Sequence, residues 1–118
     1  CYPMFFKKIH SAFLNSFQGI LNALKEEFAF KVEFSFSIFL IPAAFFIGSN
    51  SLEIILLITS TLLILLIELL NTSLETTLNR IGLEKNNLTK YAKDLGSGAV
   101  LISLLIWLTT WGLIVFSS

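Results

Sequence analysis

The chain has 118 residues, of which 55% are hydrophobic, and its mean hydropathy is +0.83. A soluble domain of this length cannot bury so much apolar surface, so the composition excludes an ordinary soluble protein and predicts a single membrane-embedded domain over residues 1–118. Eight basic and eight acidic side chains give no net charge, and the basic ones are scattered along the chain, which argues against a nucleic-acid partner.

The first predicted element is an amphipathic helix over about residues 5–26. Apolar side chains recur there every three or four residues, and polar side chains take the opposite side. The apolar positions are Phe5, Ile9, Phe13, Phe17, Ile20, Leu24 and Phe28. A helix of this kind lies in the headgroup plane with its apolar face down. Two interpretations remain open: a simple membrane-surface helix, or a helix that also forms one wall of an active site.

Three apolar segments follow, and we expect them to span the membrane at about residues 29–48, 52–80 and 90–116. The uninterrupted part of the first, residues 34–47, is short for a span of about 20 residues. It must therefore include the preceding turn, with Lys31 reaching to the interface. The third span carries Trp107 and Trp111 toward its outer end, where an aromatic belt would lie.

All eight basic residues lie on one side of these three segments. They are Lys7, Lys8, Lys25 and Lys31 before the first span, and Arg80, Lys85, Lys90 and Lys93 between the second and the third. The positive-inside rule then places the N-terminus and the loop around residues 80–93 in the cytoplasm, and the C-terminus outside.

A stripe of polar side chains marks the end of the second span. Glu68, Asn71, Glu75 and Asn79 are three, four and four residues apart, which places them on one helical face. Glu68, nearest the hydrocarbon, should be desolvated and able to act as a base, and the wetter Glu75 could hold a hard cation through oxygen. Polar contacts that only join neighbouring helices would explain the stripe equally well.

The start of the third span adds a charged pair and a small-residue face. Lys93 and Asp94 stand at its cytoplasmic mouth, beside the end of the polar stripe. Small residues that would let another helix approach closely recur at Ala92, Gly96 and Ala99. The familiar glycine-rich phosphate loops are absent from the sequence, and Cys1 is its only cysteine, which excludes a cysteine-based metal site.

Two sequence blocks resemble the prokaryotic diacylglycerol kinases, small integral membrane lipid kinases unrelated to soluble kinases. They read E-L-L-N-T-S-L-E-T-T-L-N-R-I-G over residues 68–82 and A-K-D-L-G-S-G-A-V-L over residues 92–101. The resemblance extends over about residues 8–111. It implies an all-α membrane protein in the bacterial inner membrane, assembled as a homotrimer with shared active sites. It also implies transfer of the γ-phosphate of ATP, with Mg²⁺, to diacylglycerol, giving phosphatidic acid.

The resemblance also implies roles for individual residues. Glu68 matches the catalytic base, and Glu27 and Glu75 match the carboxylates that hold the metal ion. The implied ATP contacts are Lys8, Asn15, Glu27, Glu75, Glu84, Lys85, Asn86, Lys93 and Asp94. The implied contacts with the lipid acceptor are Lys31, Glu68, Asn71, Ser97 and Trp111. The chain departs from the family pattern at Asn79, where aspartate is usual, and at Lys8, where arginine is usual.

Two alternative functions are considered. The first is undecaprenol kinase, a sister branch of the same superfamily that makes undecaprenyl phosphate. The second is a small membrane transport or assembly subunit without enzymatic activity. This second class fits the hydropathy, but it does not explain Glu27 or the adjacent Lys93 and Asp94.

Overall fold

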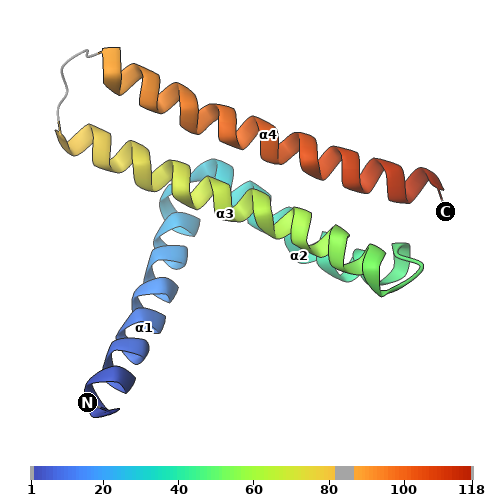
Figure 1. Ribbon diagram of the computed structural model, residues 1–118, viewed down its shortest axis with the longest axis horizontal. Coiled ribbons are helices and arrows are strands. Elements are labelled where there is room, and N and C mark those ends of the chain that lie inside the picture. Colours follow the sequence, from blue (N-terminus) through green and yellow to red (C-terminus); the bar gives the residue numbers. More distant parts are fainter. Residues whose placement is uncertain (1, 82–86, 118) are drawn as a thin grey trace.

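The computed structural model of the protein describes residues 2–81 and 87–117, which form four α-helices (Figure 1). The helices are α1 (Tyr2–Glu26), α2 (Phe28–Ile47), α3 (Ser51–Ile81) and α4 (Asn87–Ser117). Helix α3 packs against both α2 and α4, whereas α1 contacts α2 and projects away from the other helices. The predicted all-α fold, with an N-terminal helix followed by three helices able to cross a membrane, is confirmed. The homotrimer stays a prediction.

Helices α2, α3 and α4 are each long and apolar enough to cross a membrane. Helices α3 and α4 have 31 residues each, and at a rise of about 1.5 Å per residue each is about 46 Å long. The hydrocarbon core of a bilayer is only about 30 Å thick. Several turns therefore extend beyond it, and the polar C-terminal end of α3 and N-terminal end of α4 are the parts suited to do so.

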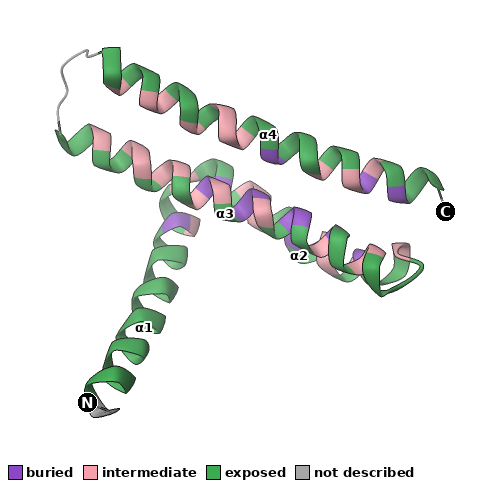
Figure 2. Ribbon diagram, in the orientation of Figure 1, coloured by how far each residue is buried: buried purple, intermediate pink, exposed green. Residues whose placement is uncertain are grey.

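Helix α1 leaves most of its apolar face exposed (Figure 2). Phe5, Phe13 and Phe17 are each more than half exposed. Among residues 4–26, whose burial is described, only Ala23 near the α2 end is buried. Apolar side chains on one face of a helix that projects from its own bundle fit contact with a membrane surface. The arrangement supports the predicted surface helix.

The bend between α1 and α2 occurs at a single residue, Glu27. Its backbone is extended, with φ −103° and ψ 108°. Its N–H still donates to the Ala23 carbonyl at 2.8 Å, and its carbonyl accepts from the Lys31 N–H at 3.0 Å. The Glu27 carboxylate makes no capping hydrogen bond to α2. The bend therefore places this carboxylate at the corner between the two helices without using it to hold the corner together.

A short, tightly packed turn connects α2 to α3. A Cβ added at Gly48 would lie 2.6 Å from Ile54 Cγ1 and 3.0 Å from the Ile54 nitrogen, so only glycine fits there. The next residues cap α3: Asn50 Oδ1 accepts from the Glu53 N–H at 3.0 Å, and Glu53 Oε1 accepts from the Ser49 N–H at 2.8 Å. These contacts fix α2 and α3 as antiparallel neighbours.

Two tryptophans join α4 to α3 at the end of the bundle near this turn. The Trp107 and Trp111 rings stack with centroids 5.4 Å apart. The Trp107 indole donates to Thr61 Oγ1 at 3.1 Å, and the Trp111 indole donates to the Leu57 carbonyl at 3.2 Å. Trp111 is only 7% exposed. The expectation of an aromatic belt is therefore wrong for Trp111, because its ring fills the contact between helices, where its N–H finds a partner.

The orientation in the membrane can be tested by labelling. A cysteine at exposed Ser51, in a chain whose Cys1 is replaced by serine, should react with an impermeant maleimide added to intact cells. A cysteine at exposed Asn87 should react only after the membrane is broken, because the distribution of basic residues predicts that this end lies in the cytoplasm. Labelling of Asn87→Cys in intact cells would reverse the orientation.

Candidate active site

Four carboxyl groups lie along the part of α3 that faces the junction of α1 and α2, and we call them the carboxyl cluster. Glu27 comes from the bend between α1 and α2, Glu33 from the second turn of α2, and Glu68 and Glu75 from α3. The Glu33 and Glu68 carboxyls interact directly, and Glu68 also experiences the charges of Glu75 and Glu27. The structure thus brings Glu27, a residue distant in sequence, into the electrostatic surroundings of the polar stripe of α3.

Glu68 is the most deeply buried acid of this group, with 9% of its surface exposed. Within residues 2–81 and 87–117 the one ion pair joins Lys90 to Asp94, so no lysine or arginine of these ranges pairs with Glu68. Its charged neighbours are other carboxylates, which repel its negative charge. A proton shared with a neighbouring carboxyl, or a nearby cation, would stabilise a buried carboxyl in these surroundings. Either arrangement is expected where a carboxyl acts as an acid or a base.

Glu33 is a further candidate for the site, although its sequence context does not single it out. Its Oε2 atom is buried and has no hydrogen-bond partner, although the same carboxyl lies against Glu68. In the sequence, Glu33 looks like the polar boundary of the first apolar span. Its place next to the apolar residues of a span could have indicated a role, because a carboxylate within a membrane span is energetically costly unless it has a partner or a function.

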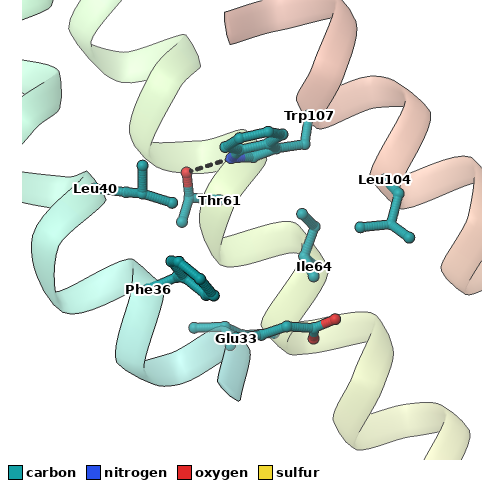
Figure 3. A pocket seen from close by; sticks show the side chains of 8 residues that line it. Glu33, Phe36, Leu40, Thr61, Ile64, Leu104 and Trp107 are labelled. Carbon is teal, nitrogen blue, oxygen red and sulfur yellow. Dashed lines mark hydrogen bonds between the residues drawn. The ribbon is translucent and has the colours of Figure 1, made fainter. Parts of the chain in front are cut away.

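An apolar cavity of about 430 Å³ begins at Glu33 and lies between α2, α3 and α4 (Figure 3). Its other lining residues are Phe36, Leu40, Thr61, Ile64, Leu65, Leu104 and Trp107. The Thr61 hydroxyl is already engaged by the Trp107 indole at 3.1 Å. The lining is therefore almost entirely hydrocarbon with a carboxyl at one end, which suits a ligand with an apolar chain and a polar head.

Asn71 lies between the two glutamates of the α3 stripe. Its Nδ2 donates to Glu75 Oε1 at 3.4 Å, a long hydrogen bond. Its Oδ1 is buried without a hydrogen-bond partner. Buried amide oxygens are nearly always satisfied, so this enclosed oxygen is unusual, and the amide nitrogen is the part of Asn71 left to contact a ligand.

A second polar group joins the ends of α3 and α4. Lys93 Nζ donates to Asn79 Oδ1 at 3.1 Å, and Lys90 forms its ion pair with Asp94 at 2.9 Å, both at exposed positions. Because Asn79 is a neutral acceptor, this hydrogen bond orients the Lys93 ammonium without neutralising it. The partner of the Lys93 ammonium in this contact is not a carboxylate, so an anionic ligand can approach Lys93 without displacing an ion pair.

Other predicted site residues lie apart from the carboxyl cluster. Lys8 and Asn15 are exposed on α1, and Lys8 lies about 28 Å along the helix axis from Glu27, as the rise per residue requires. Lys31 and Ser97 are exposed on α2 and α4. Trp111 is buried toward the opposite end of the bundle. The predicted nucleotide contacts Glu84, Lys85 and Asn86 lie outside the described residues.

Glu27 and Glu75 are the carboxylates that the family resemblance implies for Mg²⁺, and their chemistry can be compared with what this ion requires. In the part of the chain that the structure describes, no three histidine, cysteine or acidic side chains are close enough to hold a metal ion. Mg²⁺ is usually held by one or two carboxylates together with phosphate oxygens and water. Glu27 and Glu75 are hard oxygen donors, and both influence Glu68. This donor set suits a metal shared with a nucleotide better than a permanently bound ion.

A buried pair of carboxyls at one end of an apolar cavity, within three helices able to cross a membrane, defines a small helical membrane protein with room for a ligand that has an apolar chain. The model of the prokaryotic diacylglycerol kinase family matches residues 14–115, and the chain belongs to this family. A diacylglycerol kinase from Haemophilus influenzae is 46% identical over 101 residues, which cover 86% of either chain. One from Pseudomonas aeruginosa is 39% identical, covering 92% of this chain and 88% of its own length, and one from Escherichia coli is 33% identical, covering 95% and 92%.

Proposed function

We propose that this protein is an ATP-dependent lipid kinase that phosphorylates diacylglycerol and so forms phosphatidic acid. Membership of the family and the names of the relatives support this function. The structural observation that carries it is the buried Glu68 carboxyl beside the Glu33 end of the apolar cavity. Lipid hydroxyls lie at the boundary between hydrocarbon and water, and we expect Glu68 to lie there too, because it begins the polar stripe that follows the apolar part of α3.

In the proposed reaction, Glu68 accepts the proton of the lipid hydroxyl as the hydroxyl oxygen attacks the γ-phosphorus of ATP. The bond from that phosphorus to the bridging oxygen breaks, and ADP leaves with the electron pair. Asn71 lies one turn from Glu68, and its Nδ2 makes only a long hydrogen bond of 3.4 Å to Glu75. The second N–H of this amide can donate to the oxygen of the attacking hydroxyl and so orient it. Phosphoryl transfer requires mainly positioning and neutralisation of charge, and these groups supply the positioning.

The lipid would enter with an acyl chain in the apolar cavity. Glu33 then lies at the polar end of that chain, and its contact with Glu68 lets the two carboxyls share a proton until the acceptor hydroxyl arrives. An acyl chain in the cavity would keep water away from the hydrocarbon side. This exclusion favours transfer to the lipid over hydrolysis of ATP.

The nucleotide would bind on the side of α3 and α4 that carries Lys93. The Lys93 ammonium, oriented by Asn79, would contact phosphate. Glu27 and Glu75 would hold Mg²⁺, whose charge offsets that of the triphosphate when ATP is bound. Lys8 and Asn15 cannot reach this region from α1 of the same chain as it stands. Their proposed ATP contacts therefore need α1 of a neighbouring subunit or a change of the bend at Glu27.

The acceptor lipid is tested by offering candidate lipids separately. The purified protein in mixed micelles with labelled ATP should transfer label to diacylglycerol, and Glu68→Gln protein prepared in the same way should not. The relatives are named diacylglycerol kinases, so they give the undecaprenol alternative no support. Transfer of label to undecaprenol but not to diacylglycerol would nevertheless mean that undecaprenol is the acceptor. Transfer to neither lipid would contradict the proposal that the protein is a lipid kinase.

A further inference from the structure

The closest approach of α4 to the polar stripe of α3 occurs at Gly96. A Cβ built at Gly96 would overlap Asn71 Oδ1, and it would also lie 3.3 Å from Asn71 Cγ and 3.4 Å from Leu74 Cδ2. Any other residue would force the Asn71 side chain or the helices to move. Gly98, on the same helix, has nothing within 4 Å of its Cβ position. The requirement for glycine is therefore specific to position 96.

This contact fixes the direction in which the Asn71 amide points. Its Oδ1 occupies the space that a side chain at position 96 would fill, so it faces the Cα–H of Gly96, a weak donor at best. Its Nδ2 points to Glu75 Oε1 at 3.4 Å. The reverse orientation would place the amide oxygen against a carboxylate, which is repulsive. Gly96 on one side and Glu75 on the other thus leave the amide one favourable orientation.

We propose that Gly96 is a positioning residue for phosphoryl transfer, because its missing side chain leaves the room that holds Asn71 between Glu68 and Glu75. This inference rests on the proposed function, in which Asn71 orients the lipid hydroxyl. A methyl group at position 96 would push the amide away from α4 and toward the neighbouring carboxyls. Misplacement of a positioning group by about 1 Å can lower a rate by about 100-fold, so a small steric change should have a large kinetic effect.

The test compares Gly96→Ala with the matched control Gly98→Ala. Gly96→Ala should lower kcat by about 10-fold or more while the KM values for ATP and lipid change by less than about threefold, because the binding surfaces for both substrates are preserved. Gly98→Ala should keep kcat within about twofold, since its added methyl group enters open space. Equal kcat values for the two variants would overturn the proposal.

A double-mutant cycle separates positioning from general helix packing. In an Asn71→Ala background, Gly96→Ala should cause no further loss of the residual kcat, because the atoms with which the methyl group collides are gone. A loss equal to that in the wild-type background would mean that Gly96 only sets the spacing of the helices, and would overturn the proposal.

Thermal unfolding in micelles gives a readout that does not depend on activity. Gly96→Ala should lower the melting temperature, and adding Asn71→Ala should recover part of the loss by removing the overlap. This comparison holds even when Gly96→Ala is too unstable to assay. A double variant that melts no higher than Gly96→Ala would contradict the contact itself. Inactivity of the wild-type protein on every lipid would instead contradict the proposed function, with the melting result unaffected.

Discussion

Replacement of Glu68 by glutamine is expected to lower the turnover number by about 100-fold or more, because a general base contributes on that order to catalysis. The amide keeps the shape of the side chain but cannot accept the proton of the lipid hydroxyl. The variant should fold normally, since it removes one charge from a group of carboxylates that repel one another. The measurement is kcat at saturating ATP and lipid, together with the melting temperature in the same micelles.

Glu53→Gln provides the matched control for this variant. Glu53 is on the same helix at its opposite end, where its carboxylate accepts from the Ser49 N–H, and an amide oxygen can still accept that hydrogen bond. Its kcat should stay within about twofold of the wild type, as expected for a capping residue far from the reaction. A Glu68→Gln enzyme that retains more than about a tenth of the wild-type rate would exclude Glu68 as the base.

The helices were predictable because they depend on local patterns. Apolar residues recur on one side of residues 5–26, uninterrupted apolar runs mark the later helices, and Gly48 with Asn50 and Glu53 marks the turn between two of them. The polar stripe was equally accessible, since Glu68, Asn71 and Glu75 share a helical face by spacing alone. All of these signals lie within a few turns of one helix.

The contacts between helices were not predictable in the same way. A helix that is apolar on all sides gives no indication of which face meets its neighbour. The contact of Glu33 with Glu68, the burial of Trp111 against Leu57 and the fit of Asn71 against Gly96 each depend on that choice of face. The small-residue pattern indicated that close packing would occur near Gly96. It did not identify Asn71 as the side chain that would use the space.

The roles of Lys8 and Asn15 rest on the family resemblance alone. Helix α1 carries both residues away from the carboxyl cluster of its own chain (Figure 1), whereas the bend at Glu27 leaves the Glu27 carboxylate close enough to influence Glu68. One chain thus supplies the proposed base and metal ligands. The proposed ATP contacts from the N-terminal half of α1 are the part of the site that the same chain does not bring close. A homotrimer with shared sites, as the resemblance implies, would supply that half from a neighbouring subunit.

Glu27→Gln and Glu75→Gln are expected to raise the concentrations of Mg²⁺ and ATP needed for half-maximal activity by about 10-fold or more. Replacing a residue that only supports a metal ligand already lowers metal affinity or activity by about 10- to 100-fold. An amide is also a weaker ligand for a hard cation than a carboxylate. Both variants should recover much of their kcat at saturating Mg²⁺ and ATP, which distinguishes them from Glu68→Gln. The measurement is initial rate against Mg²⁺ concentration at several fixed ATP concentrations.

Glu26→Gln is the matched control, because Glu26 is the exposed neighbour of Glu27 at the end of α1 and carries the same charge. Its Mg²⁺ requirement should match that of the wild type if the position of the carboxylate matters, and should rise like that of Glu27→Gln if only the local negative charge matters. Binding of Mn²⁺ followed by electron paramagnetic resonance, with a non-hydrolysable ATP analogue present, should weaken in Glu27→Gln and Glu75→Gln but not in Glu26→Gln. Unchanged Mn²⁺ binding in both of the first two variants would place the metal ligands elsewhere in the chain.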